Sequence, residues 1–392
     1  MRMKNRLKYP LSLYVVWHPK FTEGKRIANN IYSIFCRDVN DPLSRGLGIP
    51  VYYRSDSSNK TPIAIDTKNA TRNALVLLID QHFFLDADFR AYTVELTKLV
   101  DNNTRIFPVS LYASAHEIGC GLTSLQFIRA YKGDFTVPAN LDFSIKTLKS
   151  ELLHDCARLL MNFQPTYEDK DENRIPSPVK LFLSHAKKDG LEITKRFKAF
   201  VDAELKLDVF FDTVDIADGY EFEKQIEGNI KDAALVVFHT DEYSSREWCR
   251  IEVLVAKRNN CSIVVVHDIK NGEKRAFPYL GNMPTITIKE DEKESFVEIV
   301  NLTLCQVLNN LFQHELLESF QKEFASAGVE FVSITTPPEL FNYIYIHKKK
   351  DTAKGQLVIL YPEPPLGAEE LKLLNEIDKD IKFITPILLP TL

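Results

Sequence analysis

The sequence lacks long apolar runs and any strong excess of one charge. No window approaches the roughly 20 consecutive apolar residues of a membrane-spanning helix. The basic start is followed only by a short apolar run at residues 11–17, which is too short for a secretory signal. The net charge of −5 provides no broad basic surface for nucleic acid. These absences predict a protein that binds neither membrane nor nucleic acid directly.

The six cysteines form no C-x-x-C pair, and no histidine cluster accompanies them. A zinc site or a disulfide framework is therefore not expected, and a reducing cytoplasm is the predicted location. No G-x-G-x-x-G follows a strand in the second half of the chain, and there is no P-loop. We therefore do not propose a dehydrogenase of the Rossmann type.

The clearest domain boundary is at residues 164–178. This segment holds three prolines and many charges but almost no apolar residues. It cannot bury a core and is predicted to be an exposed linker. We expect domains at residues 1–163, 179–312 and 313–392.

Residues 179–312 alternate between short apolar runs and helical patterns. Strands are predicted at residues 179–184, 209–211, 235–238, 261–267 and 285–288. Helices are predicted at residues 191–205 and 221–231, around residues 248–255 and at about 295–311. Such alternation indicates an α/β fold with a mostly parallel sheet flanked by helices. Ligands of such sheets bind beyond the carboxyl ends of the strands.

Residues 1–163 repeat this plan, and the runs ALVLL at 74–78 and ALVVF at 234–238 match closely. We interpret the match as an internal duplication. Residues 313–392 are predicted to hold helices at 313–326 and 368–378, with strands at 329–334, 357–361 and 381–389. This part is either a shortened third unit or an α/β appendage.

One segment carries the predicted chemistry, namely the sequence YSSREWCRIE at residues 243–252, which directly follows an apolar strand. Trp248 and Glu252 are four residues apart and so share one face of a helix. An indole beside a carboxylate at this turn could hold a flat cationic ring. The alternative is that Trp248 belongs to the core and Glu252 is a solvated acid.

Three motifs together resemble the Toll/interleukin-1 receptor (TIR) domain family. They are LFLSHAKKD at residues 181–189, FFD with the loop to Tyr220, and SREWCRIE at residues 245–252. The resemblance covers about residues 178–310 and implies tandem domains of flavodoxin-like or TIR-like fold. The chain resembles bacterial members of the family that cleave NAD at the nicotinamide–ribose bond.

The resemblance implies that Glu252 is the catalytic carboxylate. It also implies a substrate-binding role for Trp248, Ser184, His185, Asp212 and Gly219. NAD would be the substrate, and no cofactor or metal is expected. Nicotinamide leaves NAD as a neutral molecule, so one anion that stabilises the developing sugar cation could suffice.

The first domain is predicted to lack this carboxylate. When Phe89 is aligned with Trp248, Thr93 takes the position of Glu252, and a shift by one residue brings Tyr92 there instead. Glu95 points about a third of a turn away from that face. We expect one active unit and one or two inactive ones, which would sense a ligand, dock a partner or direct assembly.

The resemblance thus implies an NAD glycohydrolase that depletes NAD as an antiviral immune effector. Activity would require self-association through residues 212–220 and an activating ligand or partner protein. Two alternatives stay open: a non-enzymatic adaptor that binds other TIR domains, and an enzyme that makes a cyclic ADP-ribose signal.

Overall fold

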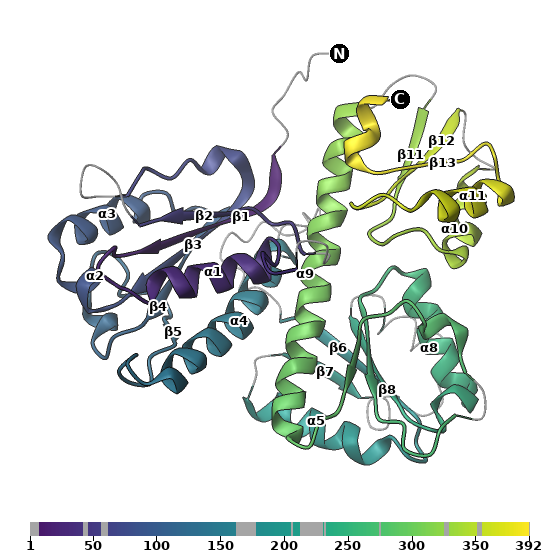
Figure 1. Ribbon diagram of the computed structural model, residues 1–392, viewed down its shortest axis with the longest axis horizontal. Coiled ribbons are helices and arrows are strands. Elements are labelled where there is room, and N and C mark those ends of the chain that lie inside the picture. The colour runs from purple at the N-terminus through teal and green to yellow at the C-terminus, as the bar shows by residue number, and fades with distance from the viewer. Residues whose placement is uncertain are drawn as a thin grey trace. The chain divides into compact units, whose positions relative to one another are not determined.

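The computed structural model describes residues 8–41, 46–55, 62–161, 178–204, 207–211, 230, 233–273, 276–324, 329–350 and 355–391. Within these residues the chain forms three sheets with exclusively parallel strands, flanked by helices. The predicted α/β class with parallel, helix-covered sheets is confirmed (Figure 1).

The first sheet has the strand order β2-β1-β3-β4-β5. Its strands are β1 (Tyr9–Trp17), β2 (Val51–Arg54), β3 (Ala70–Ile79), β4 (Thr104–Ser110) and β5 (Ile128–Arg129). The central strands β1 and β3 are buried along nearly their whole length, because helices cover both faces.

Two helices, α1 (Gly24–Phe35) and α4 (Pro138–Met161), pack against each other on one face of this sheet (Figure 1). The helices α2 (Gln81–Leu85) and α3 (Ala87–Thr97) cover the other face. Each of the latter two begins at an aspartate whose carboxylate accepts backbone N–H groups, Asp80 for α2 and Asp86 for α3.

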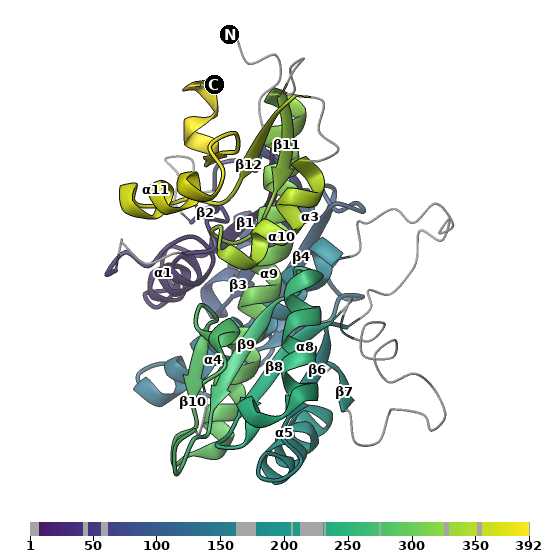
Figure 2. The same ribbon diagram turned by 90° about the vertical axis from the view of Figure 1, so that its right-hand side faces the viewer.

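The second sheet has the order β10-β9-β8-β6-β7, which Figure 2 shows strand by strand. Its strands are β6 (Lys180–His185), β7 (Asp208–Phe211), β8 (Ala234–His239), β9 (Ile263–His267) and β10 (Thr285–Thr287). The apolar runs predicted these strands, because a strand buried on both faces needs apolar side chains in both directions.

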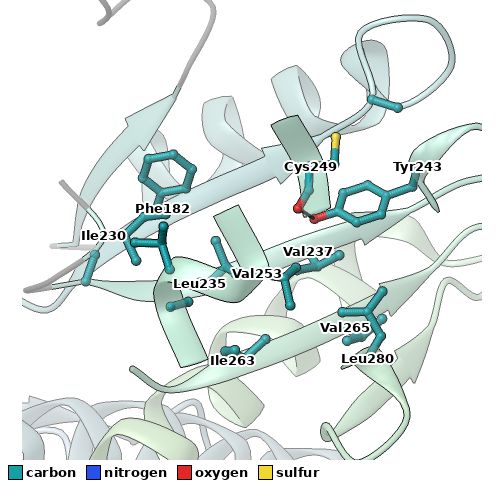
Figure 3. Packing of buried hydrophobic residues seen from close by; sticks show 14 residues of the cluster. Phe182, Ile230, Leu235, Val237, Tyr243, Cys249, Val253, Ile263, Val265 and Leu280 are labelled. Atoms are coloured by element: carbon teal, nitrogen blue, oxygen red, sulfur yellow. Dashed lines mark hydrogen bonds between the residues drawn. The ribbon is translucent and has the colours of Figure 1, made fainter. Parts of the chain in front are cut away.

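Alternate side chains of this second sheet face different helices. Phe182, Leu235 and Val237 pack beneath α8 (Glu247–Arg258) in one core (Figure 3). On the other face, the ring of Phe238 contacts Phe197 of α5 (Leu191–Glu204) at 5.4 Å between centroids. Both faces of the sheet are therefore closed, and its strand ends remain as the place for polar chemistry.

The third sheet has the order β11-β12-β13. Its elements are β11 (Val329–Ser333), α10 (Leu340–Lys350), β12 (Gln356–Leu360), α11 (Ala368–Ile377) and β13 (Lys382–Ile384). The strand predicted at residues 381–389 is shorter than expected. It ends at Ile384, and a 3-10 helix over Pro386–Thr391 follows, because proline at 386 cannot donate to a strand ladder.

The chain divides into two compact units, one of Met1–Arg174 with Leu311–Leu392 and one of Ile175–Asn310. The helices predicted at 295–311 and 313–326 are one helix, α9 (Glu292–Phe324). Its sequence contains neither glycine nor proline, so nothing interrupts the backbone hydrogen bonds between the two predicted segments. The domain limits at 163, 178 and 312 stay a prediction, and the helix predicted at 221–231 lies almost wholly outside the described residues.

No helix among the described residues is both long enough and apolar enough to cross a lipid bilayer. All six cysteines lie among the described residues, and none of them forms a disulfide.

Candidate active site

The carboxylate of Glu252 lies inside the protein rather than in solvent. Its residue is only 3% exposed. Five residues of α8 are buried, namely Cys249, Glu252, Val253, Val255 and Ala256. All but Val255 have the i, i+3, i+4, i+7 spacing of a helix face packed on a sheet. An acid in such a stripe is costly to desolvate, so its carboxylate requires polar partners.

Two hydroxyl groups supply these partners. Ser184, at the carboxyl end of β6, donates a hydrogen bond to the Glu252 carboxylate. The hydroxyl of Tyr243 lies 2.6 Å from Ser184 Oγ. Because Ser184 has one hydroxyl proton and gives it to Glu252, Tyr243 is the donor between these two. The result is a chain of donors that ends on the carboxylate.

Tyr243 is fully buried in the core between the sheet and α8 (Figure 3). Its one hydroxyl proton is shared with the carbonyl oxygen of Cys249, which accepts from it at 3.3 Å in the first turn of α8. Burial, followed by the nearby Cys249 and Glu252, raises the pKa of Tyr243 well above its ordinary value. Tyr243 therefore stays a neutral hydrogen-bond donor at physiological pH.

Trp248 differs from Glu252 in its exposure, which is 49% of its surface. It lies one turn nearer the start of α8, about 6 Å along the axis at 1.5 Å per residue. Since α8 follows β8, its amino end lies near the carboxyl edge of the parallel sheet. The structure thus places an exposed indole in the first turn of α8 and a buried carboxylate one turn further along the helix. The alternative of a core tryptophan beside a solvated acid is contradicted on both counts.

His185 does not join Ser184 and Glu252. Successive residues of a strand point to opposite faces, so the imidazole of His185 lies on the side of β6 away from Ser184. Burial lowers the pKa of His185 to about 4, which keeps the ring neutral at physiological pH. The predicted residues Asp212 and Gly219, and the loop at 212–220, lie outside the described residues.

A second set of contacts fixes the segment that precedes α8. The carboxylate of Asp189 accepts hydrogen bonds from the Thr240 hydroxyl at 2.7 Å and the Glu242 amide at 3.0 Å. Lys188 forms an ion pair with Glu242, and this contact lowers the pKa of that carboxyl. The β6–α5 connection is thereby joined to the β8–α8 connection at the carboxyl edge of the sheet.

The first sheet has no carboxylate at the matching place of its helix α3. Thr93, which the alignment of the two halves places opposite Glu252, is fully buried. Its hydroxyl donates to the Phe89 carbonyl of the same helix at 2.9 Å. Glu95 is exposed and pairs with Lys98 on the surface.

Comparison with known proteins bears on the second sheet. Residues 181–300 match the family model described as TIR domain. The chain contains a TIR domain. The matched residues begin in β6 and end in α9, so they include Ser184, Tyr243, Trp248 and Glu252. The resemblance carried by the three sequence motifs is therefore confirmed at the level of the domain.

One similar solved structure contains the TIR domains of the activated Roq1 resistosome, which directly recognizes the pathogen effector XopQ. Its alignment with this chain has 16% sequence identity and a TM-score of 0.22. That alignment covers 32% of this chain and 83% of the other. Tagatose-6-phosphate ketose/aldose isomerase from Escherichia coli aligns with 11% identity and a TM-score of 0.24, covering 80% of this chain and 84% of the other. No curated protein matches the chain.

Proposed function

We propose that the TIR domain of this chain is an NAD glycohydrolase with Glu252 as its catalytic carboxylate. The observation that carries the proposal is the burial of this acid at the carboxyl edge of a parallel sheet, with Ser184 donating to it. A buried carboxylate is a candidate for catalysis when it lies at the carboxyl ends of the strands, where ligands of such folds bind, and when a side chain donates a hydrogen bond to it.

The proposed step breaks the bond between ribose C1′ and the nicotinamide nitrogen. The bonding electron pair leaves with nicotinamide, which departs as a neutral molecule, and positive charge develops on the ribose. An anion in a water-poor site stabilises that charge far more than it would in bulk water. Water then adds to C1′ and loses a proton, which gives ADP-ribose.

The two hydroxyl groups hold the carboxylate rather than react. Ser184 and Tyr243 orient Glu252 and offset part of the cost of keeping an anion buried. Trp248, one turn nearer the start of α8 and half exposed, would stack on the nicotinamide or the ribose. Preorganised groups of this kind act without reorganising during the reaction.

We place this activity in the cytoplasm, as an antiviral effector that depletes NAD after assembly and in response to a ligand or partner. The test is to incubate the full-length protein at high concentration with NAD and to separate the products by chromatography. We expect nicotinamide to appear with wild-type protein and not with Glu252→Ala.

The ribosyl product distinguishes the alternatives. Linear ADP-ribose supports the glycohydrolase, and a cyclic product supports a signal-producing enzyme. If wild-type protein releases no nicotinamide at any concentration, a non-enzymatic adaptor becomes the better explanation. Nicotinamide release that persists in Glu252→Ala would contradict the assigned role of Glu252.

A further inference from the structure

A second polar cluster lies beside the Glu252 site and is built from residues that the proposed reaction does not use. Glu273, in the connection between β9 and β10, accepts a 2.6 Å hydrogen bond from His239 Nε2 and another hydrogen bond from the Ser244 hydroxyl. His239 Nε2 and Ser244 Oγ are 3.2 Å apart. His239 and Ser244 are 5% and 3% exposed, and the Glu273 side chain is 15% exposed.

The backbone after β9 makes a turn that directs Glu273 towards His239 and Ser244. The carboxylate of Asp241 accepts hydrogen bonds from the backbone amides of Lys270 and Asn271 at 2.8 and 2.9 Å. Gly272 has a φ of +91°, in the left-handed region that favours glycine. Glu273 follows directly, with its carboxylate turned inward to His239 and Ser244.

The two clusters meet at adjacent residues of the chain. The Tyr243 hydroxyl contacts Ser184, which donates to Glu252, whereas the next residue, Ser244, donates to Glu273. The Tyr243 ring also lies edge-on to His239, with 5.7 Å between centroids. The short helix Tyr243–Ser245 is therefore fixed by Ser184 through the Tyr243 hydroxyl and by Glu273 through the Ser244 hydroxyl.

We infer that Glu273 is a positioning residue for the catalytic carboxylate, acting through Ser244 and Tyr243. The inference rests on the proposed function. Glu273 would fix the short helix at residues 243–245, and this helix would fix both the Tyr243 hydroxyl and the start of α8. Loss of Glu273 would let the Glu252 carboxylate move relative to a bound ribose, and misplacement by about 1 Å can cost on the order of 100-fold in rate.

The test compares Glu273→Ala, Glu273→Gln and Ser244→Ala in the full-length protein, with Asp268→Asn as the matched control. Asp268 lies in the same connection and loses the same charge, but its carboxylate pairs with Lys270 at 3.7 Å. For Glu273→Ala we expect kcat for NAD to fall on the order of 10-fold to 100-fold with KM nearly unchanged. Glu273→Gln keeps an acceptor for Ser244 and should restore much of kcat.

A second readout does not depend on catalysis. Hydrogen exchange of the backbone amides at residues 243–252 should be about tenfold faster in Glu273→Ala than in Asp268→Asn, because local opening is no longer restrained. Ser244→Ala should speed exchange there too, and the effects of Ser244→Ala and Glu273→Ala should not add.

The two readouts separate the inference from the proposed function. Unchanged exchange in Glu273→Ala would overturn the positioning role whatever the activity. Faster exchange with a kcat equal to that of Asp268→Asn would overturn it as well. Absence of NAD turnover in the wild type would instead refute the proposed function, and the exchange data would still decide whether Glu273 fixes the start of α8.

Discussion

The hydroxyl of Ser184 donates to the carboxylate of Glu252, although 68 positions separate the two residues. One stands at the end of β6 and the other in the second turn of α8, on the same face of the sheet. The contact explains how an acid tolerates burial in this core, and it leads to predictions that separate its contribution to activity from its contribution to folding.

Removal of the serine hydroxyl should lower activity more than stability. In Ser184→Ala the carboxylate loses its donor and the fixed orientation that this donor provides, so we expect kcat for NAD to fall about 10-fold to 100-fold. The steady-state rate with NAD measures this. Ser245→Ala is the control, because that exposed hydroxyl contacts Glu242 instead. Equal rates in the two variants would show that Ser184 does not orient Glu252.

Removal of the tyrosine hydroxyl should be detectable in stability. Tyr243→Phe keeps the buried ring but deletes the donor to Ser184, and a buried hydrogen bond contributes about 0.5–1.5 kcal/mol. We expect the urea midpoint of the TIR domain to fall accordingly, and kcat to fall with it. An unchanged midpoint together with an unchanged kcat would contradict the donor chain.

Trp248 should matter for substrate and hardly at all for folding. A side chain that is 49% exposed lies outside the core, so Trp248→Ala should change the free energy of unfolding by less than about 0.5 kcal/mol. Its loss should raise KM for NAD if the indole stacks on the substrate.

Val253→Ala should lower stability, whereas Trp248→Ala should raise KM for NAD. Val253 is fully buried on the same helix, and truncation of a buried aliphatic side chain leaves a cavity that destabilises the fold. We expect it to lower the urea midpoint clearly. A destabilised Trp248→Ala with normal KM would show that the tryptophan is structural.

Several parts of this arrangement could be predicted from sequence, for local reasons. Continuous apolar runs located the strands of the second sheet, and the spacing of Trp248 and Glu252 placed both on one helix. The resemblance of three motifs identified the TIR domain, although the assigned roles of Asp212 and Gly219 stay predictions.

Other features depend on contacts between distant parts of the chain. His239 and Glu273 are 34 positions apart, and no local pattern marks a glutamate in a connection as the partner of a histidine at a strand end. The side-chain direction of His185 followed from strand alternation only once the end of β6 was known. The helix α4 was not predicted at all, and α9 was divided in two where the sequence holds no residue that would break a helix.

The buried His185 predicts a specific dependence of stability on pH. Its pKa is about 4 in the folded protein and near 6.5 in an unfolded chain, so the unfolded state binds more protons between these values. Stability should therefore fall as the pH drops from about 6.5 towards 4, and His185 should contribute no such change above that window.

The measurement is the urea midpoint at pH 7.5 and at pH 5.5. The drop between the two should be smaller in His185→Gln than in wild type, because glutamine does not titrate. His314→Gln, at a half-exposed histidine of α9, serves as control and should keep the wild-type drop. Identical drops in all three proteins would contradict the neutral, buried state of His185.

The central claim is that one buried carboxylate performs the chemistry, and a matched pair of substitutions on α8 tests it most directly. Glu252→Gln and Glu247→Gln each remove one negative charge from this helix, but Glu252 is buried at the site whereas Glu247 is exposed in the first turn. Nicotinamide release from NAD by the full-length protein should be abolished in Glu252→Gln and retained in Glu247→Gln. Release by Glu252→Gln at the rate of Glu247→Gln would contradict the claim, because the reaction would then proceed without the Glu252 carboxylate.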